Sequence, residues 1–273
     1  MTKCHLLLLC AALVLLAGCK KPAPGPSLSE YGAQTLAGQA AQFEQYVLQL
    51  AELPVEEAVR RQDAMLRDAE ADSAHWQQLV VLQEKFLLDP NSPYRNEELY
   101  LPVAESLLRA PWSSPSQRER AEWLLPRLQL NRPGTEAADF PFTLPNGRET
   151  TLHVTLDARN PKHTLLFFSN PGCPNCKEIA ETLADDPDIS AQIADGTLLV
   201  VNIYPDEDLT AWYDYLPNYP KSWICGYDPR QILHSDTRYW VRAIPSLYLL
   251  DEQKRVVRKD APLELILVDC KQR

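Results

Sequence analysis

The chain has 273 residues, a formal net charge of −10 at pH 7 and 45% hydrophobic residues. A strongly acidic chain repels the phosphate backbone of nucleic acids, so we do not expect the protein to bind nucleic acids. An acidic chain also gains nothing from an anionic bilayer, so any membrane attachment requires another device.

Residues 1–18 have the pattern of a secretory signal peptide. Lys3 supplies positive charge, and the apolar stretch 6–16 is too short to span a bilayer. The stretch leads into Leu16-Ala17-Gly18-Cys19, which resembles the lipobox of bacterial lipoproteins. The resemblance implies cleavage before Cys19, lipidation of that residue, and a lipid-anchored protein in the cell envelope that faces the periplasm. The alternative is an ordinary signal peptide followed by a chance cysteine.

Cleavage at this position changes the number of cysteines in the mature chain, and the residues that follow it form a linker. Of seven cysteines, four then remain unmodified: Cys173, Cys176, Cys225 and Cys270. Disulfides persist outside the cytosol, but four thiols form at most two bridges, which excludes a dense disulfide framework. Residues 19–27 are a proline-rich tether, and no later segment is long and apolar enough to cross a membrane.

Residues 28–132 are predicted to form a small all-α domain. Apolar residues spaced three and four apart predict helices over 41–50, from 54 onward, over 76–88, over 96–109, and from 115 to about 130. Asp72 or Ser73 is the expected cap of the third helix. Pro102 should kink or divide the fourth. The turn residues at 131–134 mark the domain boundary.

Residues 133–273 have an α/β pattern. Asn146-Gly147 predicts a hairpin between strands at 139–144 and 150–154. Further strands are expected at 163–169, 197–204, 223–227, 246–250 and 255–258. Helices are expected after Cys176, over 209–215 and over 229–234, whereas 262–268 fits either a helix or a strand.

Cys173 and Cys176 lie between a predicted strand and a helical pattern, which is the layout of a thioredoxin-like redox site. A cysteine at a helix N-terminus is favoured as thiolate, the form that attacks disulfides. Two intervening residues bring the second sulfur within bonding reach, and Pro174 is tolerated in a first helical turn. A half zinc site is the alternative, but the chain lacks the spacing for two more ligands, so no metal is expected.

Three segments resemble the thioredoxin superfamily, and more closely its membrane-tethered TlpA/ResA type. They are Ala138-Asp139-Phe140, Cys173-Pro174-Asn175-Cys176, and 243–251 with its Ile244-Pro245 pair. The resemblance covers about 135–270 and implies a thioredoxin-like α/β fold, a central mixed sheet flanked by helices. It also implies that no bound cofactor is needed, because the cysteines hold the electrons.

The resemblance implies a role for each residue of the site. Cys173 is the outer sulfur that attacks, Cys176 resolves the mixed disulfide, and Pro174 and Asn175 form the redox loop between them. Pro245 is the expected cis proline facing the disulfide, which leaves the Ile244 backbone free to bind an extended client peptide. A trans proline at a strand start is the alternative.

The chain departs from the family at two positions. Phe167 stands where thioredoxins place a buried acid, six residues before the first cysteine, so proton transfer to Cys176 should be slower. Gly172 stands where they place a tryptophan, so the outer sulfur should be less shielded. Cys225 and Cys270 are expected to be packing residues, although a bridge between them is possible.

The sequence therefore predicts a membrane-tethered thiol–disulfide oxidoreductase. Its partners would be cysteine-containing client proteins and an unidentified electron-transfer partner. The alternative is a non-catalytic binding or assembly lipoprotein that uses the second domain as a scaffold. Residues 89–100 resemble an uncharacterised helical domain that precedes thioredoxin modules in envelope lipoproteins. That domain could hold a client, position the redox site, or act only as a spacer.

Overall fold

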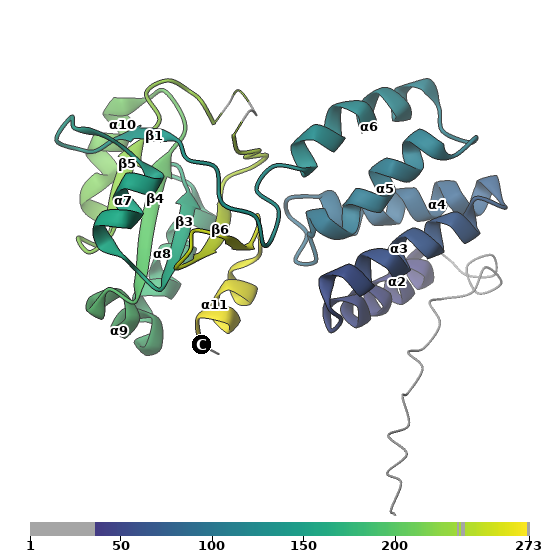
Figure 1. Cartoon of the computed structure of the whole chain (residues 1–273), viewed down its shortest axis with the longest axis horizontal. Helices are drawn as coiled ribbons and strands as arrows, with labels where there is room; N and C mark the ends of the chain where they lie inside the picture. Colours follow the sequence, from purple (N-terminus) through teal and green to yellow (C-terminus); the bar gives the residue numbers. More distant parts are fainter. Residues whose placement is uncertain (1–35, 234, 236–237, 272–273) are drawn as a thin grey trace, which may run out of the picture.

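The computed structural model of the protein describes residues 36–271, except 234, 236 and 237. The predicted signal peptide, the tether and Cys19 lie outside these residues. The described chain forms a bundle of helices followed by a domain built on a β-sheet, and the two lie side by side (Figure 1). Within the described residues, no helix combines the length and apolarity needed to cross a bilayer.

Within the described residues, the first domain consists of five α-helices and one π-helical turn. They are α2 (Leu36–Ala51), α3 (Val55–Ala69), α4 (Ser73–Gln83), the π-helical turn η1 (Glu84–Leu88), α5 (Glu97–Arg109) and α6 (Pro115–Leu128). Their apolar faces enclose a single core in which Trp76 and Tyr100 are fully buried. The predicted all-α domain is confirmed, and the helix expected over 76–88 corresponds to α4 together with η1.

The ends of these helices are set by side-chain caps. The Asp72 carboxylate accepts hydrogen bonds from the N–H groups of Ala74 and His75 at 2.8 and 3.0 Å, so Asp72 is the cap of α4. Asn96 caps α5 in the same way. Pro102 lies inside α5, which continues past it to Arg109, so the helix is not divided.

A mixed seven-stranded sheet forms the second domain, with strand order β2-β1-β5-β4-β3-β6-β7. The strands are β1 (Pro141–Thr143), β2 (Glu149–Thr151), β3 (His163–Phe168), β4 (Leu198–Tyr204), β5 (Ile224–Tyr227), β6 (Ser246–Asp251) and β7 (Val256–Arg258). β3, β4 and β5 are parallel, whereas β6 runs antiparallel to β3. The central strands are buried on both faces, as their continuous apolar sequences require.

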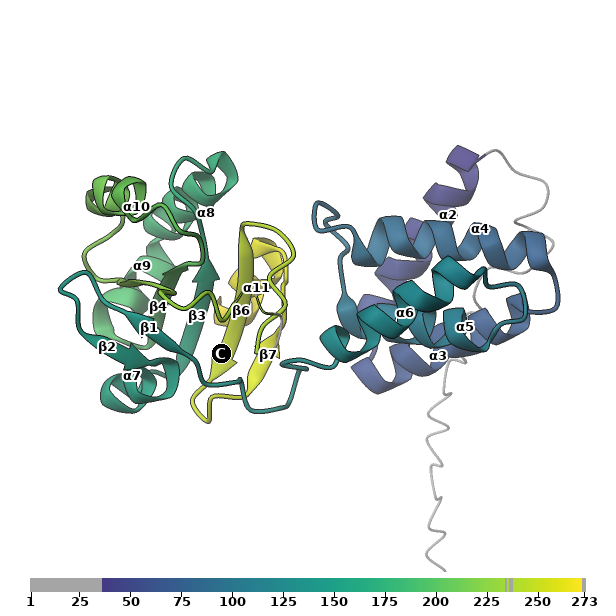
Figure 2. The same ribbon diagram turned by 90° about the horizontal axis from the view of Figure 1, so that it is seen from above.

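Helices cover both faces of the sheet and enclose two cores. Four of them pack on one face (Figure 2): α8 (Pro174–Asp185), α9 (Pro187–Asp195), α10 (Leu209–Tyr215) and α11 (Leu263–Lys271). The other face is covered by α7 (Leu152–Arg159). The one-turn 3₁₀-helix η2 (Leu216–Asn218) follows α10. The predicted sheet flanked by helices is confirmed.

The structure corrects two predicted elements and resolves a third. The strand predicted over 150–154 is wrong beyond Thr151, because α7 begins at Leu152. The Thr151 hydroxyl caps that helix by accepting from the Val154 N–H at 3.3 Å. The helix predicted over 229–234 is also wrong for its described part, a turn in which the Asp228 carboxylate binds the N–H of Leu233. The segment over 262–268 is helical, as part of α11, and α9 was not predicted.

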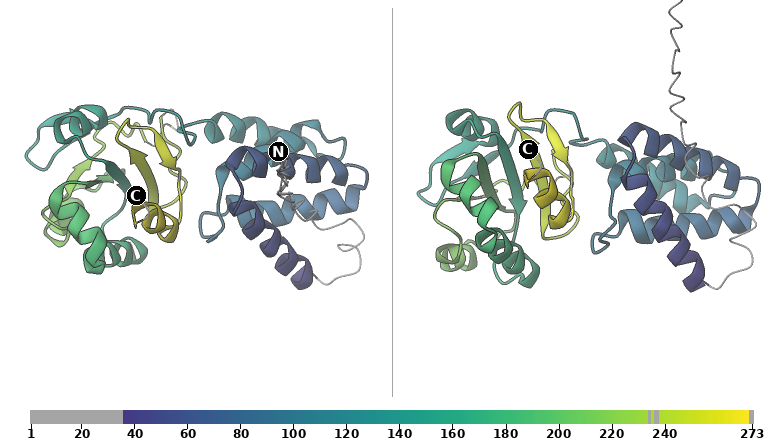
Figure 3. Two further views of the ribbon diagram at one scale, coloured as in Figure 1. Left: turned by 60° about the horizontal axis from the view of Figure 1, so that its bottom comes forward. Right: turned by 90° about the horizontal axis from the view of Figure 1, so that it is seen from below.

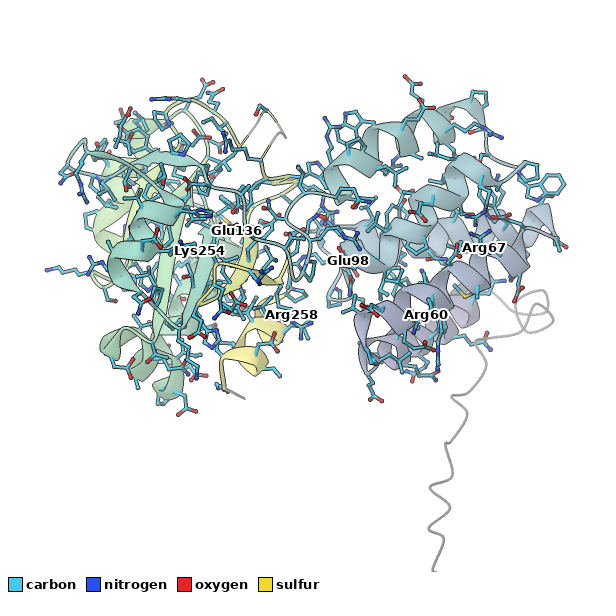
Figure 4. All side chains as sticks on the ribbon, viewed as in Figure 1. Arg60, Arg67, Glu98, Glu136, Lys254 and Arg258 are labelled. Atoms are coloured by element: carbon cyan, nitrogen blue, oxygen red, sulfur yellow. A yellow bond between two sulfur atoms is a disulfide. The ribbon has the colours of Figure 1, made fainter. Side chains whose placement is uncertain are left out.

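The two domains meet through a cluster of four buried charged side chains, here called the interface charge cluster: Glu97, Arg242, Lys259 and Asp260. Glu97 belongs to α5, whereas the other three flank β6 and β7, the strands nearest the helical domain (Figure 3). Arg242 lies 2.7 Å from Asp260 and 3.2 Å from Glu97, and Lys259 lies 2.7 Å from Glu97. At the rim of this contact, Glu98 pairs with Arg132 at 2.6 Å (Figure 4).

Candidate active site

The candidate site lies at the edge of the sheet where β3 ends and β6 begins. Phe168, the last residue of β3, pairs with Ser246, the first residue of the antiparallel strand β6. The loop that follows β3 leads to Cys173, and the turn that precedes β6 contains Ile244 and Pro245. The sheet register therefore brings two segments seventy residues apart to the same edge, as the resemblance implied.

Cys173 and Cys176 form a disulfide at the N-terminus of α8, with their Cα atoms 5.2 Å apart. Cys173 is the N-cap of the helix, and its sulfur accepts a hydrogen bond from the Cys176 N–H at 3.1 Å. Pro174 begins α8 and Asn175 follows it on the surface. Cys173 is half-buried, whereas Cys176 is only 3% exposed. Cys173 is therefore the sulfur that a second molecule can reach, and the helix dipole favours its thiolate.

Gly172 adopts a left-handed backbone conformation, with φ +73°. A Cβ atom added there would meet no other atom within 4 Å, so space does not restrict the position. The positive φ does, because a bulky side chain is strained in this region. The loop geometry thus accounts for the absence of a tryptophan before Cys173 and leaves that side of the sulfur uncovered.

The Ile244–Pro245 peptide bond is cis, as the resemblance implied. Ile244 is half-buried, and its side chain packs against the cores on both faces of the sheet. Among the described residues, neither the N–H nor the C=O of Ile244 has a hydrogen-bond partner. Backbone groups without partners beside a strand end can bind an extended peptide as an added strand does.

A buried polar cluster lies on the α8 side of the sheet and was not predicted. Asn202 donates to the Ser169 hydroxyl at 2.7 Å, and Ser169 shares a 2.9 Å hydrogen bond with the Tyr219 hydroxyl. Phe167 is fully buried in the apolar core that also contains Cys176. The phenyl ring of Phe167 can neither donate nor accept a proton. Ser169, Asn202 and Tyr219 supply polar side chains on the same side of the sheet. Asn202, a polar residue inside the otherwise apolar strand β4, was the signal in the sequence.

Cys225 and Cys270 are both buried and neither is disulfide-bonded, so the bridge considered between them is not formed. Burial raises the pKa of the Cys225 thiol to about 12. A thiol that stays protonated at neutral pH is neither a nucleophile nor a metal ligand. Cys173 and Cys176 are therefore the candidate redox pair, and the packing interpretation of Cys225 agrees with its burial.

Family comparisons agree with this division of the chain. Residues 154–259 match the thioredoxin-like domain, and residues 34–131 match a domain of unknown function, DUF5106. A thioredoxin-like protein from Bacteroides caccae is 30% identical over 100% of both chains, with a TM-score of 0.79. The chain belongs to this family of thioredoxin-like proteins, which confirms the assignment to the thioredoxin superfamily behind a helical domain.

Two other solved structures match about half of the chain. The C-terminal domain of an uncharacterized protein from Bacteroides fragilis is 40% identical and covers 52% of this chain and 98% of its own, with a TM-score of 0.48. A conserved protein of unknown function from Bacteroides fragilis is 32% identical and covers 50% and 98%, with a TM-score of 0.47. Among curated proteins, none matches the chain significantly.

Proposed function

We propose that the protein is a thiol–disulfide oxidoreductase that acts on cysteine-containing proteins of the cell envelope. The observation that supports this most directly is a half-buried cysteine at a helix N-terminus, disulfide-bonded to a buried one. The unpaired backbone of Ile244 at the same sheet edge offers a binding position for a client peptide. Fold alone does not establish activity, so the proposal depends on this arrangement of groups.

The reaction moves two electrons between the cysteine pair and a client. When the protein acts as reductant, the Cys173 thiolate attacks a client disulfide. A Cys173–client S–S bond forms and one client thiolate leaves. Cys176 then loses its proton and attacks the Cys173 sulfur, which releases the second client thiolate and leaves the Cys173–Cys176 disulfide. An electron-transfer partner reduces that disulfide again, and the reverse sequence oxidises a client.

We propose further that lipid at Cys19 tethers the protein to a membrane, with both domains facing the periplasm. The support is the lipobox-like sequence that ends at Cys19. Metabolic labelling with a fatty acid should mark the wild-type chain and not a Cys19→Ser variant. Label retained by the variant would contradict the proposed anchor and would leave the redox chemistry untouched.

Equilibration with glutathione tests the redox function. The full chain is incubated across a range of reduced and oxidised glutathione, and the Cys173–Cys176 state is read by alkylation and mass. A reversible two-electron transition is expected, and its midpoint assigns the protein as reductant or oxidant. A pair that stays in one state across the whole range would contradict the proposal.

A trapping experiment separates exchange from simple binding. In the Cys176→Ser variant the mixed disulfide at Cys173 cannot be resolved, so disulfide-linked clients should accumulate. The matched control is Cys225→Ser, which removes a buried thiol and should trap nothing. If Cys176→Ser also traps nothing, the binding or assembly lipoprotein becomes the better interpretation.

A further inference from the structure

A groove of about 460 Å³ lies between the two domains and reaches the candidate site. One wall is the segment 90–95 of the helical domain, here called the η1–α5 loop, which projects toward the second domain (Figures 2 and 3). The opposite wall comes from α8, from Ile244 and Pro245, and from the start of α11. Asn175, between the two cysteines, also lines the groove. The helical domain therefore contributes surface directly beside the redox pair.

The η1–α5 loop is a preformed wall. Within the helical domain, the Ser92 hydroxyl donates to the Phe86 carbonyl at 2.6 Å and accepts from the Tyr94 N–H at 3.1 Å. Across the domain contact, Arg95 Nε donates to the Asp260 carbonyl at 2.8 Å. A wall fixed from both sides loses little conformational freedom when a ligand binds, so its shape can discriminate between ligands.

The lining of the groove favours a particular chemistry. Its apolar surface includes Pro93, Ile179 and Leu263, which suit an apolar side chain. Glu178 and Glu264 line the same groove, and both are exposed. Arg95, which also lines the groove, interacts electrostatically with Glu264, whereas Glu178 forms no ion pair with another described residue. Glu178 is therefore available to attract a cation on the ligand, and Glu264 adds negative charge that Arg95 offsets only in part, since the two carboxylates outnumber the one guanidinium.

We propose that the η1–α5 loop makes the redox site selective, by shaping a groove for an extended client segment whose cysteine is flanked by apolar and basic side chains. The inference rests on the proposed redox function and adds a client class to it. Asn175, which lies two residues from Cys173, and Ile244, whose backbone has no partner among the described residues, both line the groove. A segment held there would therefore bring its own cysteine near Cys173. The helical domain thus takes part in client recognition.

Reaction rates with defined disulfides test the proposal in the reduced full chain. Two synthetic peptides, Ala-Ala-Lys-Cys-Leu-Ala-Ala and Ala-Ala-Glu-Cys-Gly-Ala-Ala, are prepared as mixed disulfides with 2-thiopyridine. Attack by the Cys173 thiolate forms a Cys173–peptide disulfide and expels pyridine-2-thione, whose absorbance gives the rate. Neutral 2,2′-dipyridyl disulfide, which is too small to need the groove, reports the intrinsic reactivity of Cys173. The Lys/Leu peptide should react about tenfold faster than the Glu/Gly peptide.

Two variants connect this preference to the groove. Asn91→Trp places an indole in the groove from the η1–α5 loop. It should lower the rate with the Lys/Leu peptide about tenfold while leaving the rate with dipyridyl disulfide unchanged. Its control, Gln49→Trp on α2, adds the same side chain at another exposed position. Glu264→Lys should abolish the preference for the Lys/Leu peptide, whereas Glu52→Lys, an equal change of charge away from the groove, should retain it.

Each outcome decides between the alternatives. The proposal is overturned if the two peptides react equally fast in the wild type. It is also overturned if Asn91→Trp slows dipyridyl disulfide as strongly as the peptide, because the indole would then be disturbing the cysteines and not the groove. A wild-type chain that fails to react even with dipyridyl disulfide contradicts the redox function itself, which is a separate and recognisable failure.

Discussion

The turn before β6 contributes both to the redox site and to the contact between the two domains. Its polar groups are paired at the domain contact and unpaired at the redox site. Arg242, at the start of the turn, has its guanidinium between two carboxylates and is almost fully buried. Ile244, two residues later, leaves its N–H and C=O without partners among the described residues. Paired groups fix the position of the turn, and unpaired groups remain available to a ligand.

Replacing Cys173 gives the largest expected effect, because it removes the accessible group of the redox edge. Cys173→Ser should lose exchange with disulfides down to the rate without protein, since serine is no nucleophile at neutral pH. Release of pyridine-2-thione measures the loss. Cys225→Ser, which changes a buried thiol with a pKa near 12, should keep the wild-type rate. Full exchange activity in Cys173→Ser would contradict the assignment of Cys173, and not the buried Cys225, as the reactive cysteine.

The interface charge cluster gives the next largest effect, on stability. Glu97→Gln leaves Arg242 and Lys259 buried with one carboxylate fewer, so the free energy of unfolding should fall by about 3 kcal/mol. The matched control is the neighbouring Glu98→Gln. The Glu98 side chain is also buried, at 8% exposed, so the two variants differ mainly in the burial of the cationic partner. Arg132 is 38% exposed and can be solvated once the pair is lost, so that loss should stay near 1 kcal/mol. Urea unfolding measures both, and equal losses would show that burial does not set the difference.

The dependence of stability on alkaline pH tests the burial of the Cys225 thiol, which forms no ion pair with another described residue. Burial raises the pKa of Cys225 from its ordinary 9.0 to about 12, so from pH 9 upward the unfolded chain releases this proton before the folded chain does. The stability contributed by the neutral thiol is complete below pH 9 and is lost between pH 9 and pH 12. The decrease attributable to this group approaches about 1.4 kcal/mol per pH unit. Unfolding curves of Cys225→Ala should decline less steeply, and parallel curves would contradict the assignment.

Local signals made the sheet domain and the redox pair predictable. Buried strands are continuous apolar runs, and a Cys-x-x-Cys between strand and helix has few alternatives. The sequence predicts a strand at the start of α7 because Val154, like Thr150 and Thr151 before it, is a β-branched residue, which favours strands. The Thr151 cap and the burial of Leu156 override that preference.

Contacts between distant segments could not be predicted. Glu97 and Lys259 are 162 positions apart, and charged residues in a sequence ordinarily indicate a solvated surface. The groove combines segment 90–95 with three segments of the second domain, so no single stretch of sequence reveals it. For this reason the sequence alone does not decide whether the helical domain holds a client, positions the redox site or acts only as a spacer.

The polar cluster under α8 gives the smallest effect and tests whether a paired polar group contributes even at the redox edge. Tyr219→Phe deletes the hydroxyl that bonds Ser169, so unfolding should become easier by about 1 kcal/mol. The cost should not be larger, because Ser169 keeps its hydrogen bond from Asn202. Tyr215→Phe is the control, since that neighbouring ring contacts Tyr219 and its hydroxyl has no partner among the described residues. Equal stability losses in the two variants would mean that the Ser169–Tyr219 bond contributes nothing. A loss confined to Tyr219→Phe would show that hydrogen-bonded polar groups stabilise the structure around the redox site, as the paired charges do at the domain interface. The unpaired groups of Ile244 would then lie in a structure that paired groups stabilise.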